Sequence, residues 1–150
     1  MKLRPELMPP PLEKALVTRL AHLANCLDGA KAGQGKEELE EFNRLGGTSI
    51  SREHFQCIYK AEEHEDWVRR VLYQRFLFPD PNLTRAEMAE IVSRVMACDD
   101  DHDFFLELFL VNCTHPSSSD LIFWPNLVPE LPQDRDPTAE EIAALAMRGN

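Results

Sequence analysis

Apolar residues recur at helical spacing along most of the chain, and no segment shows the sustained alternation of apolar and polar positions that is typical of a strand. After the triple proline at residues 9–11, leucines and alanines at three- and four-residue intervals predict a first helix, which Gly29 ends. A second, acidic helix is predicted from Lys36 to Leu45, with the two following glycines as its stop. The pattern therefore predicts an all-α protein.

Two more helices are predicted before residue 80. The segment Thr48–Ser51 offers N-cap oxygens for a third helix. Its apolar side would carry Phe55, Ile58 and Tyr59. A fourth helix is predicted from Glu62 to Phe78, because the prolines that follow cannot continue it. This break favours a boundary between an N-terminal helical module, residues 1–80, and a second domain, residues 81–150.

The second domain has strong signals for helix starts. Thr84 and Glu87 have the spacing of a capping box and predict a helix that runs to about Met96. The next helix is predicted over residues 98–112, and its acidic first turn suits the helix dipole. The last helix is predicted to begin at Asp136-Pro137, with the proline near its first position.

Charge divides the chain unequally. Residues 1–80 hold 12 Lys and Arg against 13 Asp and Glu, whereas residues 81–150 hold 4 Arg, no Lys and 13 Asp and Glu. Such an acidic half would be repelled by phosphate backbones, which argues against nucleic acid as a direct ligand. A cationic protein partner is the positive inference, and solubility is the alternative reading of the same charge.

No apolar stretch approaches the roughly 20 residues that a membrane-spanning helix needs. The first residues also lack the apolar core of a secretory signal, so we expect a cytoplasmic protein that does not enter a membrane.

The predicted helix over residues 98–112 has apolar residues on two faces. One face carries Phe105, Leu108 and Phe109. The other carries Asp103, Leu106, Glu107 and Leu110. Two interpretations stay open at this point: the second face contacts a partner protein, or the helix is central and buried on several sides.

Two adjacent aromatic residues, Phe123 and Trp124, precede Pro125 in an apolar segment too short for a full helix. Both rings cannot point inward from such a turn, so at least one is expected to reach solvent or a partner. Large aromatic residues are enriched in binding hot spots, and Asp120 could add a charge-assisted bond to a basic partner. The alternative is that Leu121, Ile122 and one aromatic ring close the core.

The sequence THPSSSDLIFWP at residues 114–125 resembles the signature of the colicin and pyocin DNase immunity proteins. An acidic helix precedes it and a proline-started helix follows, as in that family, and the resemblance covers about residues 82–150. It implies a four-helix domain with a short third helix, preceded here by an N-terminal helical extension. It also implies a bacterial inhibitor that binds the basic HNH-type nuclease domain of a bacteriocin beside its active site and blocks access to DNA.

The resemblance assigns partner-binding residues to two elements. On the second helix of the domain they are Asp99, Asp100, Asp103, Leu106, Glu107 and Leu110. On the short third helix they are Asp120, Phe123, Trp124 and Pro125. The family usually has two tyrosines where this chain has Phe123 and Trp124. Phe123 lacks a hydroxyl group, whereas Trp124 keeps an N–H donor and a large ring face.

Catalytic motifs are incomplete, so we expect no enzyme activity and no cofactor. His64-Glu65 lacks the second histidine of a zincin motif, because residue 68 is Val68. The acidic run at residues 99–103 lacks the glycine spacing of a calcium loop. The four cysteines form no CxxC pair, and we expect them to be buried and free rather than to hold a metal ion.

A second hypothesis keeps the acidic binding surface and changes its target. The protein could be an adaptor or regulator that reuses the immunity fold, with residues 1–80 supplying the distinctive contact. This N-terminal module could also dimerise the chain. A neighbouring gene for a basic nuclease would favour immunity over the adaptor.

Overall fold

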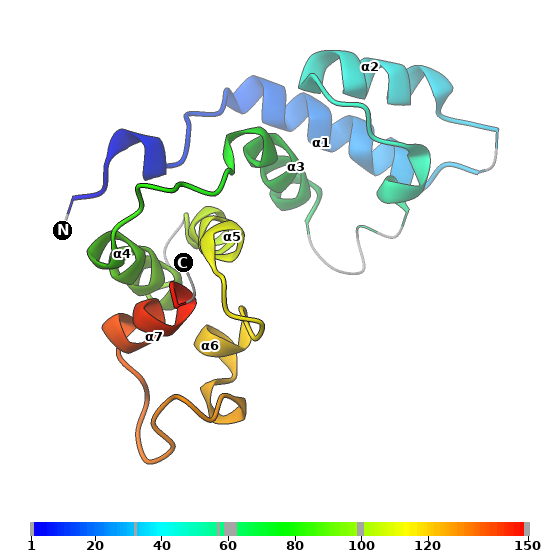
Figure 1. Cartoon of the computed structure of the whole chain (residues 1–150). Helices are drawn as coiled ribbons and strands as arrows, with labels where there is room; N and C mark the ends of the chain where they lie inside the picture. Colours follow the sequence, from blue (N-terminus) through cyan, green and yellow to red (C-terminus); the bar gives the residue numbers. More distant parts are fainter. Residues whose placement is uncertain (1, 32, 57, 59–62, 99–100, 149–150) are drawn as a thin grey trace. The chain divides into compact units, whose positions relative to one another are not determined.

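Every regular element of the described chain is a helix, so the all-α prediction is confirmed. The computed structural model describes residues 2–31, 33–56, 58, 63–98 and 101–148. The chain divides into two compact units (Figure 1). We call residues 10–75 the N-terminal unit, and residues 76–150 together with residues 1–9 the C-terminal unit.

The N-terminal unit is built around its first helix. Its elements are α1 (Lys14–Asp28), α2 (Lys36–Gly46), the 3-10 turn η2 (Arg52–Phe55) and α3 (His64–Tyr73). Helix α1 packs against the other three. The rings of Phe42, Phe55 and Trp67 meet between them, with centroids 4.9 Å apart for the two phenylalanines and 5.0 Å apart for Phe55 and Trp67. Phe42 and Phe55 therefore belong to the core of this unit, and Trp67 packs against it.

Among the described residues, no α-helix is present where the third helix is predicted: Arg52–Phe55 form the 3-10 turn η2, and Ile58 also has 3-10 conformation. The side chain of Asn43 explains the difference. Its Oδ1 accepts from the backbone N–H of Ile50 (2.9 Å) and the hydroxyl of Thr48 (2.8 Å), and its Nδ2 donates to the carbonyl of Ile50 (3.0 Å). Residues 48–50 are thus held as a loop. The hydroxyl of Thr48 is already used, and Ser51, which precedes η2, makes no side-chain capping bond. Phe55 is buried as predicted, while Tyr59 lies outside the described residues.

The predicted fourth helix is shorter than the range Glu62–Phe78. In the described residues α3 ends at Tyr73, and a 3-10 turn, η4 (Gln74–Phe76), follows it. The guanidinium of Arg75 donates to the carbonyl of Gly46 at the end of α2 (2.7 Å), which ties the turn to a different helix. The prolines after residue 78 correctly indicate that the helix cannot continue. They give no information on the contact between Arg75 and Gly46.

The C-terminal unit contains the four helices expected of an immunity-like domain, the third of them short. They are α4 (Arg85–Met96), α5 (His102–Asn112), α6 (Asp120–Phe123) and α7 (Ala139–Ala146), and a 3-10 turn, η5 (Pro125–Leu127), follows α6. Helix α4 packs against α5 and α7, and α6 packs against η5 and α7. Ile91, Phe109 and Ile142, from three of the helices, are fully buried.

Two helices of this unit begin with capping boxes. At α4, Thr84 and Glu87 exchange the side-chain and backbone hydrogen bonds that their spacing predicts. At α7, Thr138 and Glu141 do the same. The last helix therefore begins at Ala139 and not at the predicted Asp136-Pro137. The spacing of Thr138 and Glu141 was a readable signal for this start.

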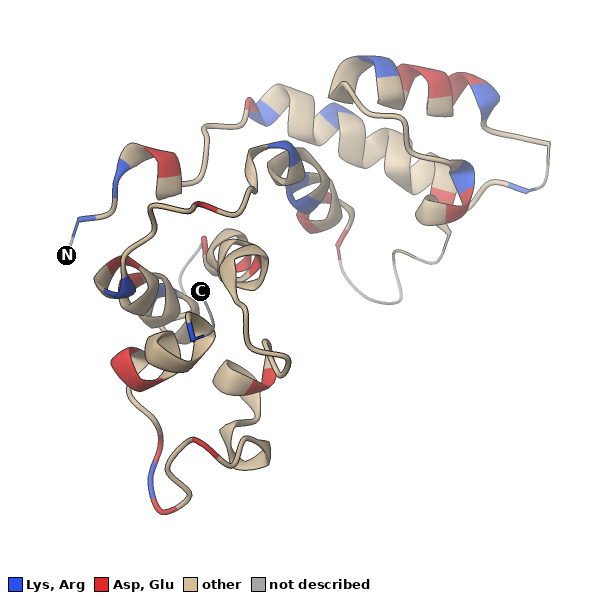
Figure 2. Cartoon of the chain, in the orientation of Figure 1, with Lys and Arg blue, Asp and Glu red and all other residues tan. Residues whose placement is uncertain are grey.

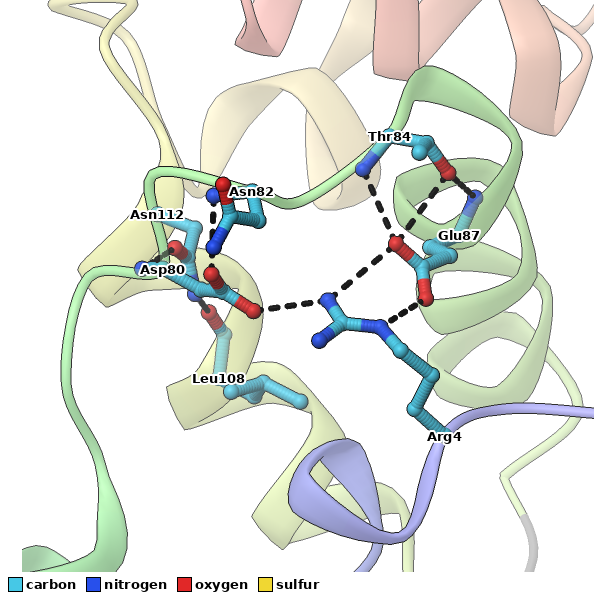
Figure 3. Close-up of polar contacts among 7 residues, drawn as sticks. All are labelled: Arg4, Asp80, Asn82, Thr84, Glu87, Leu108 and Asn112. Atoms are coloured by element: carbon cyan, nitrogen blue, oxygen red, sulfur yellow. Dashed lines mark hydrogen bonds and ion pairs between the residues drawn. The ribbon is translucent and has the colours of Figure 1, made fainter.

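Residues 1–9, which we call the N-terminal arm, pack with the C-terminal unit. Leu3 and Leu7 are 3% and 2% exposed. Figure 3 shows the guanidinium of Arg4 between two carboxylates: its Nε donates to Glu87 (2.6 Å), and its Nη2 donates to Asp80 (2.7 Å). The division into modules 1–80 and 81–150 stays a prediction. In the structure, the N-terminal arm packs with the C-terminal unit although it is distant in sequence.

The arm also reaches the far end of α4. The Nη1 of Arg94 lies 3.7 Å from the sulfur of Met8, and the guanidinium carbon of Arg94 lies 5.2 Å from the ring centroid of Phe105 on α5. The arm is therefore in contact with both ends of α4, although 66 residues of the N-terminal unit separate it in sequence from the remainder of the C-terminal unit.

Two other predictions have mixed outcomes. Among the described residues, no helix has the length and apolar character that a bilayer crossing requires. The described cysteines are free, but they are not buried as expected: Cys26 and Cys98 are exposed, and Cys113 is partly exposed. Cys26 lies on the exposed side of α1, and Cys98 lies in the turn after α4 ends at Met96, so neither position is in the core.

Candidate binding surface

The corner where α6 meets η5 carries the predicted aromatic pair. Helix α6 is a single turn, closed by the hydrogen bond from the N–H of Trp124 to the carbonyl of Asp120 (2.9 Å). Pro125 then starts η5, which is closed by the bond from the N–H of Leu127 to the carbonyl of Trp124 (2.9 Å). Two short hydrogen-bonded turns in succession fix the backbone that presents these residues.

Both aromatic rings of this corner are open to solvent. Phe123 is 50% exposed and Trp124 is 60% exposed, while Leu121 of the same turn is fully buried. Ile122 and Pro125 are partly exposed. The corner is therefore anchored to the core by Leu121 and leaves two large rings outside it, so neither ring closes the core.

A histidine joins the chain on both sides of the corner. His115 lies before α6, and its Nε2 is 2.7 Å from a carboxylate oxygen of Glu130, which lies beyond η5. Its Nδ1 accepts from the backbone N–H of Ser117 (3.0 Å), so Nε2 carries the proton that is donated to Glu130. This bond holds the pKa of Glu130 below its usual value. The side chain of His115 is 9% exposed, which is the burial expected of a structural link.

Helix α5 carries the second group of predicted residues. Phe104, Phe105, Leu108 and Phe109 are buried, so the predicted core face is present and includes one residue more than expected. The opposite stripe is at the surface: Asp103 is exposed, and Leu106, Glu107 and Leu110 are partly exposed. The helix is therefore not buried on all sides. Asp99 and Asp100, the first two predicted contacts, lie outside the described residues.

Carboxylates that support the fold are paired with cations. Arg4 binds Glu87 and Asp80, and the contact with its guanidinium is the main cause that holds the pKa of each carboxyl below its usual value (Figure 3). Arg135 binds Glu141 (2.7 Å) and lowers the pKa of that carboxyl to about 2. Both glutamates belong to capping boxes, so these pairs are structural.

Carboxylates of the candidate surface are different. Within the described part of the chain, the side chains of Glu107 and Asp120 form no hydrogen bond or ion pair, and Asp103 contacts only its neighbour His102 (3.2 Å). Residues 95–134 contain eight Asp and Glu and no Lys or Arg. Figure 2 shows acidic positions on α5, on α6 and on the loop before α7. Glu107 and Asp120 are therefore available to cations of another molecule, whereas Glu130 is already paired with His115.

The described residues offer no obvious metal site, since no three His, Cys, Asp or Glu side chains among them are grouped to hold an ion. The candidate binding surface therefore consists of the aromatic corner and the exposed stripe of α5, both of which the sequence predicts. Sequence reasoning missed two features of the corner. The pair between His115 and Glu130 spans 15 residues and has no local signal. Leu127, which is 62% exposed, lies just beyond the motif.

Comparison with known proteins identifies the segment that contains this surface. Residues 81–145 match the family model of the colicin immunity proteins and pyocin immunity proteins. The family resemblance is thereby confirmed for this segment, which covers less than half of the chain and includes α4, α5 and α6 and nearly all of α7. The family's description is that of an immunity protein and not of an enzyme. The chain matches no curated protein and no solved structure.

Proposed function

We propose that the protein is a bacteriocin immunity protein, which binds the basic HNH-type DNase domain of a toxin and inhibits it by covering its DNA-binding surface. The exposed pair of Phe123 and Trp124 carries this proposal. Soluble proteins rarely leave two adjacent large rings at half exposure on a fixed backbone unless another molecule covers them. The match of residues 81–145 to an immunity family supplies the class of that molecule.

The charge of the surface supports a cationic target. A nuclease has to attract phosphate groups, so its DNA-binding surface is rich in Lys and Arg. The acidic stretch from residue 95 to residue 134 complements such a surface, and unpaired Glu107 and Asp120 lie within it. Inhibition then needs no chemistry from the immunity protein, because a bound acidic domain excludes DNA both by volume and by charge.

The two groups of residues would have different roles. Burial of Phe123 and Trp124 would supply most of the binding energy and keep the complex from dissociating. The carboxylates of Asp103, Glu107 and Asp120 would mainly accelerate encounter and select the partner. Asp99, Asp100, Leu106, Leu110 and Pro125 complete the proposed contact surface.

The direct test is an inhibition assay. A panel of purified HNH DNase domains from colicins and pyocins would be titrated with the parent chain while DNA cleavage is followed. We expect at least one domain to be inhibited. Trp124→Ala should weaken that inhibition about 30-fold, which corresponds to about 2 kcal/mol of binding energy. Phe78→Ala is the matched control, because Phe78 is a ring of the same unit with 66% exposure that lies outside the corner.

The alternative is an acidic adaptor without a toxin target. It predicts that the parent chain inhibits no domain of the panel, and that a pull-down from the source cell recovers a basic protein with no nuclease activity. Recovery of a nuclease that loses activity in the complex would exclude the adaptor.

A further inference from the structure

We infer that Leu127 is a third apolar anchor of the binding surface, and that the cationic partner carries an apolar patch that receives it. The inference rests on the proposed function and extends the surface beyond the residues that the sequence motif selects. Leu127 is 62% exposed, which is as open as its neighbour Trp124 at 60%.

The backbone places Leu127 next to Trp124. The N–H of Leu127 donates to the carbonyl of Trp124, and the N–H of Val128 donates to the carbonyl of Pro125 (3.0 Å), so η5 is one closed 3-10 turn. Trp124 is the residue that caps η5 and Leu127 is its last residue, so the hydrogen bond between them holds their backbones together, and Phe123 ends the preceding turn. We call these three residues the apolar ridge.

The fold does not need Leu127 for its core. Leu121 on one side of the ridge is fully buried, and Val128 and Leu131 on the other side are 1% and 3% exposed. These buried residues anchor the chain before and after η5. The side chain of Leu127 therefore lies mostly in solvent and is not needed to hold the corner in place. The hydrogen bond between His115 and Glu130, which we call the latch, links the chain before α6 to the chain after η5. A rigid element with an outward apolar ridge can bury that ridge against a partner at little cost in conformational entropy.

Charge decides between the two occupants that an apolar ridge could have. A second copy of the chain would bring a second acidic stretch of residues 95–134 against the first, and neither copy offers a Lys or Arg there. A basic domain meets the same carboxylates with opposite charge. The fitting partner is therefore a cationic surface with an apolar patch positioned for η5.

The test compares single variants in the full chain. The Kd and the dissociation rate for each HNH DNase domain of the panel would be measured for the parent, Leu127→Ala and Leu127→Asp. We expect Leu127→Ala to raise the Kd about tenfold, mainly through faster dissociation, and Leu127→Asp to raise it further. Phe78→Ala is the control, because Phe78 is 66% exposed in the same unit and lies outside residues 95–134. Unchanged thermal unfolding would show that each variant is folded.

The outcomes separate this inference from the proposed function. In the first outcome, a domain binds the parent and Trp124→Ala raises the Kd, but Leu127→Ala leaves the Kd unchanged. Leu127 is then not an anchor, and the proposed immunity function stands. If no domain of the panel binds the parent, the proposed function fails and the inference fails with it. If the parent forms dimers that Leu127→Ala dissociates, the occupant is a second copy and the inference is overturned.

Discussion

The two units of the chain use their large apolar residues in opposite ways. The N-terminal unit packs Phe42, Phe55 and Trp67 against one another, and its most exposed large apolar residue among those described is Leu45 at 37%. The C-terminal unit leaves Phe123, Trp124 and Leu127 at half exposure or more. Phe76 and Phe78 of this unit are also exposed, at 45% and 66%. The α6–η5 corner differs because three exposed apolar side chains lie within five residues beside Asp120, which is unpaired among the described residues, and this grouping favours a binding role.

The two units also differ in how their helices are capped at the N-terminus. Helices α1, α2 and α3 of the N-terminal unit begin without a side-chain capping bond. Helices α4 and α7 of the C-terminal unit begin with capping boxes. The glutamate of the first box binds Arg4 of the arm, and that of the second binds Arg135 in the loop before α7. Helices α5 and α6 begin without such a bond, so, among the described residues of this unit, side-chain caps are confined to α4 and α7. Capped helices beside the corner suit a surface that binds without rearrangement.

The strongest test of this contrast truncates one ring in each unit. Phe55→Ala should lower the free energy of unfolding by about 4 kcal/mol, because Phe55 is fully buried. Trp124→Ala should change it by less than about 0.5 kcal/mol, because the ring is mostly exposed. Denaturant unfolding of both variants would measure the difference. A large loss of stability in Trp124→Ala would mean that the ring supports the fold.

A second test asks where the N-terminal arm belongs. Leu7→Ala should destabilise the C-terminal unit by about 3 kcal/mol, as expected for truncation of a buried leucine. Hydrogen exchange should become faster in α4, with α1 unaffected. Leu23→Ala, which truncates a buried leucine of α1, is the matched variant and should have the reverse pattern. Faster exchange in α1 for the Leu7 variant would contradict the assignment.

Acid should weaken the arm before it affects the aromatic core of the N-terminal unit. The pKa values of Glu87 and Asp80 are lowered in the folded state, chiefly by Arg4. Their contribution to stability is therefore complete above the usual carboxyl range of about 4, and it is lost as the pH falls through the lowered values.

Arg4→Met isolates this contribution, since it leaves both carboxylates without their cation. Urea unfolding of the parent and the variant at pH 6 and pH 2 would compare them. The variant should be less stable than the parent at pH 6, and the gap should narrow at pH 2. An equal gap at both values would show that the ion pairs do not contribute in this way.

The smallest effect is expected from the acids of α5. Asp103→Lys should slow association with a basic DNase domain several-fold at low salt and leave stability almost unchanged, because exposed charges act mainly on encounter. Stopped-flow measurements at two salt concentrations would give the rates. Arg85→Ala changes one exposed charge at the start of α4 and serves as the control. An unchanged rate would remove Asp103 from the recognition surface.

Sequence reasoning succeeded where the determining contacts are local. The capping box of Thr84 and Glu87 and the buried face with Phe105 and Phe109 follow from residues three or four apart. It failed where the determining contact is distant in sequence. No local pattern announces that Arg4 binds Glu87 across 83 positions.

The third predicted helix failed for a similar reason, because the amide of Asn43 satisfies the backbone of Ile50 and holds the segment as a loop. The candidate site shows the same division. The motif located Phe123 and Trp124, whereas the latch of His115 and the exposure of Leu127 became visible only with the fold.

The packing of the N-terminal arm determines which fragments of this protein keep their core intact. A fragment cut at residues 81–145 would lack Leu3, Arg4 and Leu7, and it would begin one residue after Asp80. It would expose apolar surface that the native chain covers, and aggregation of that fragment would say nothing about its ability to bind. Two stretches of sequence, residues 1–9 and residues 76–150, have to be produced together if the immunity-like part is to be studied alone.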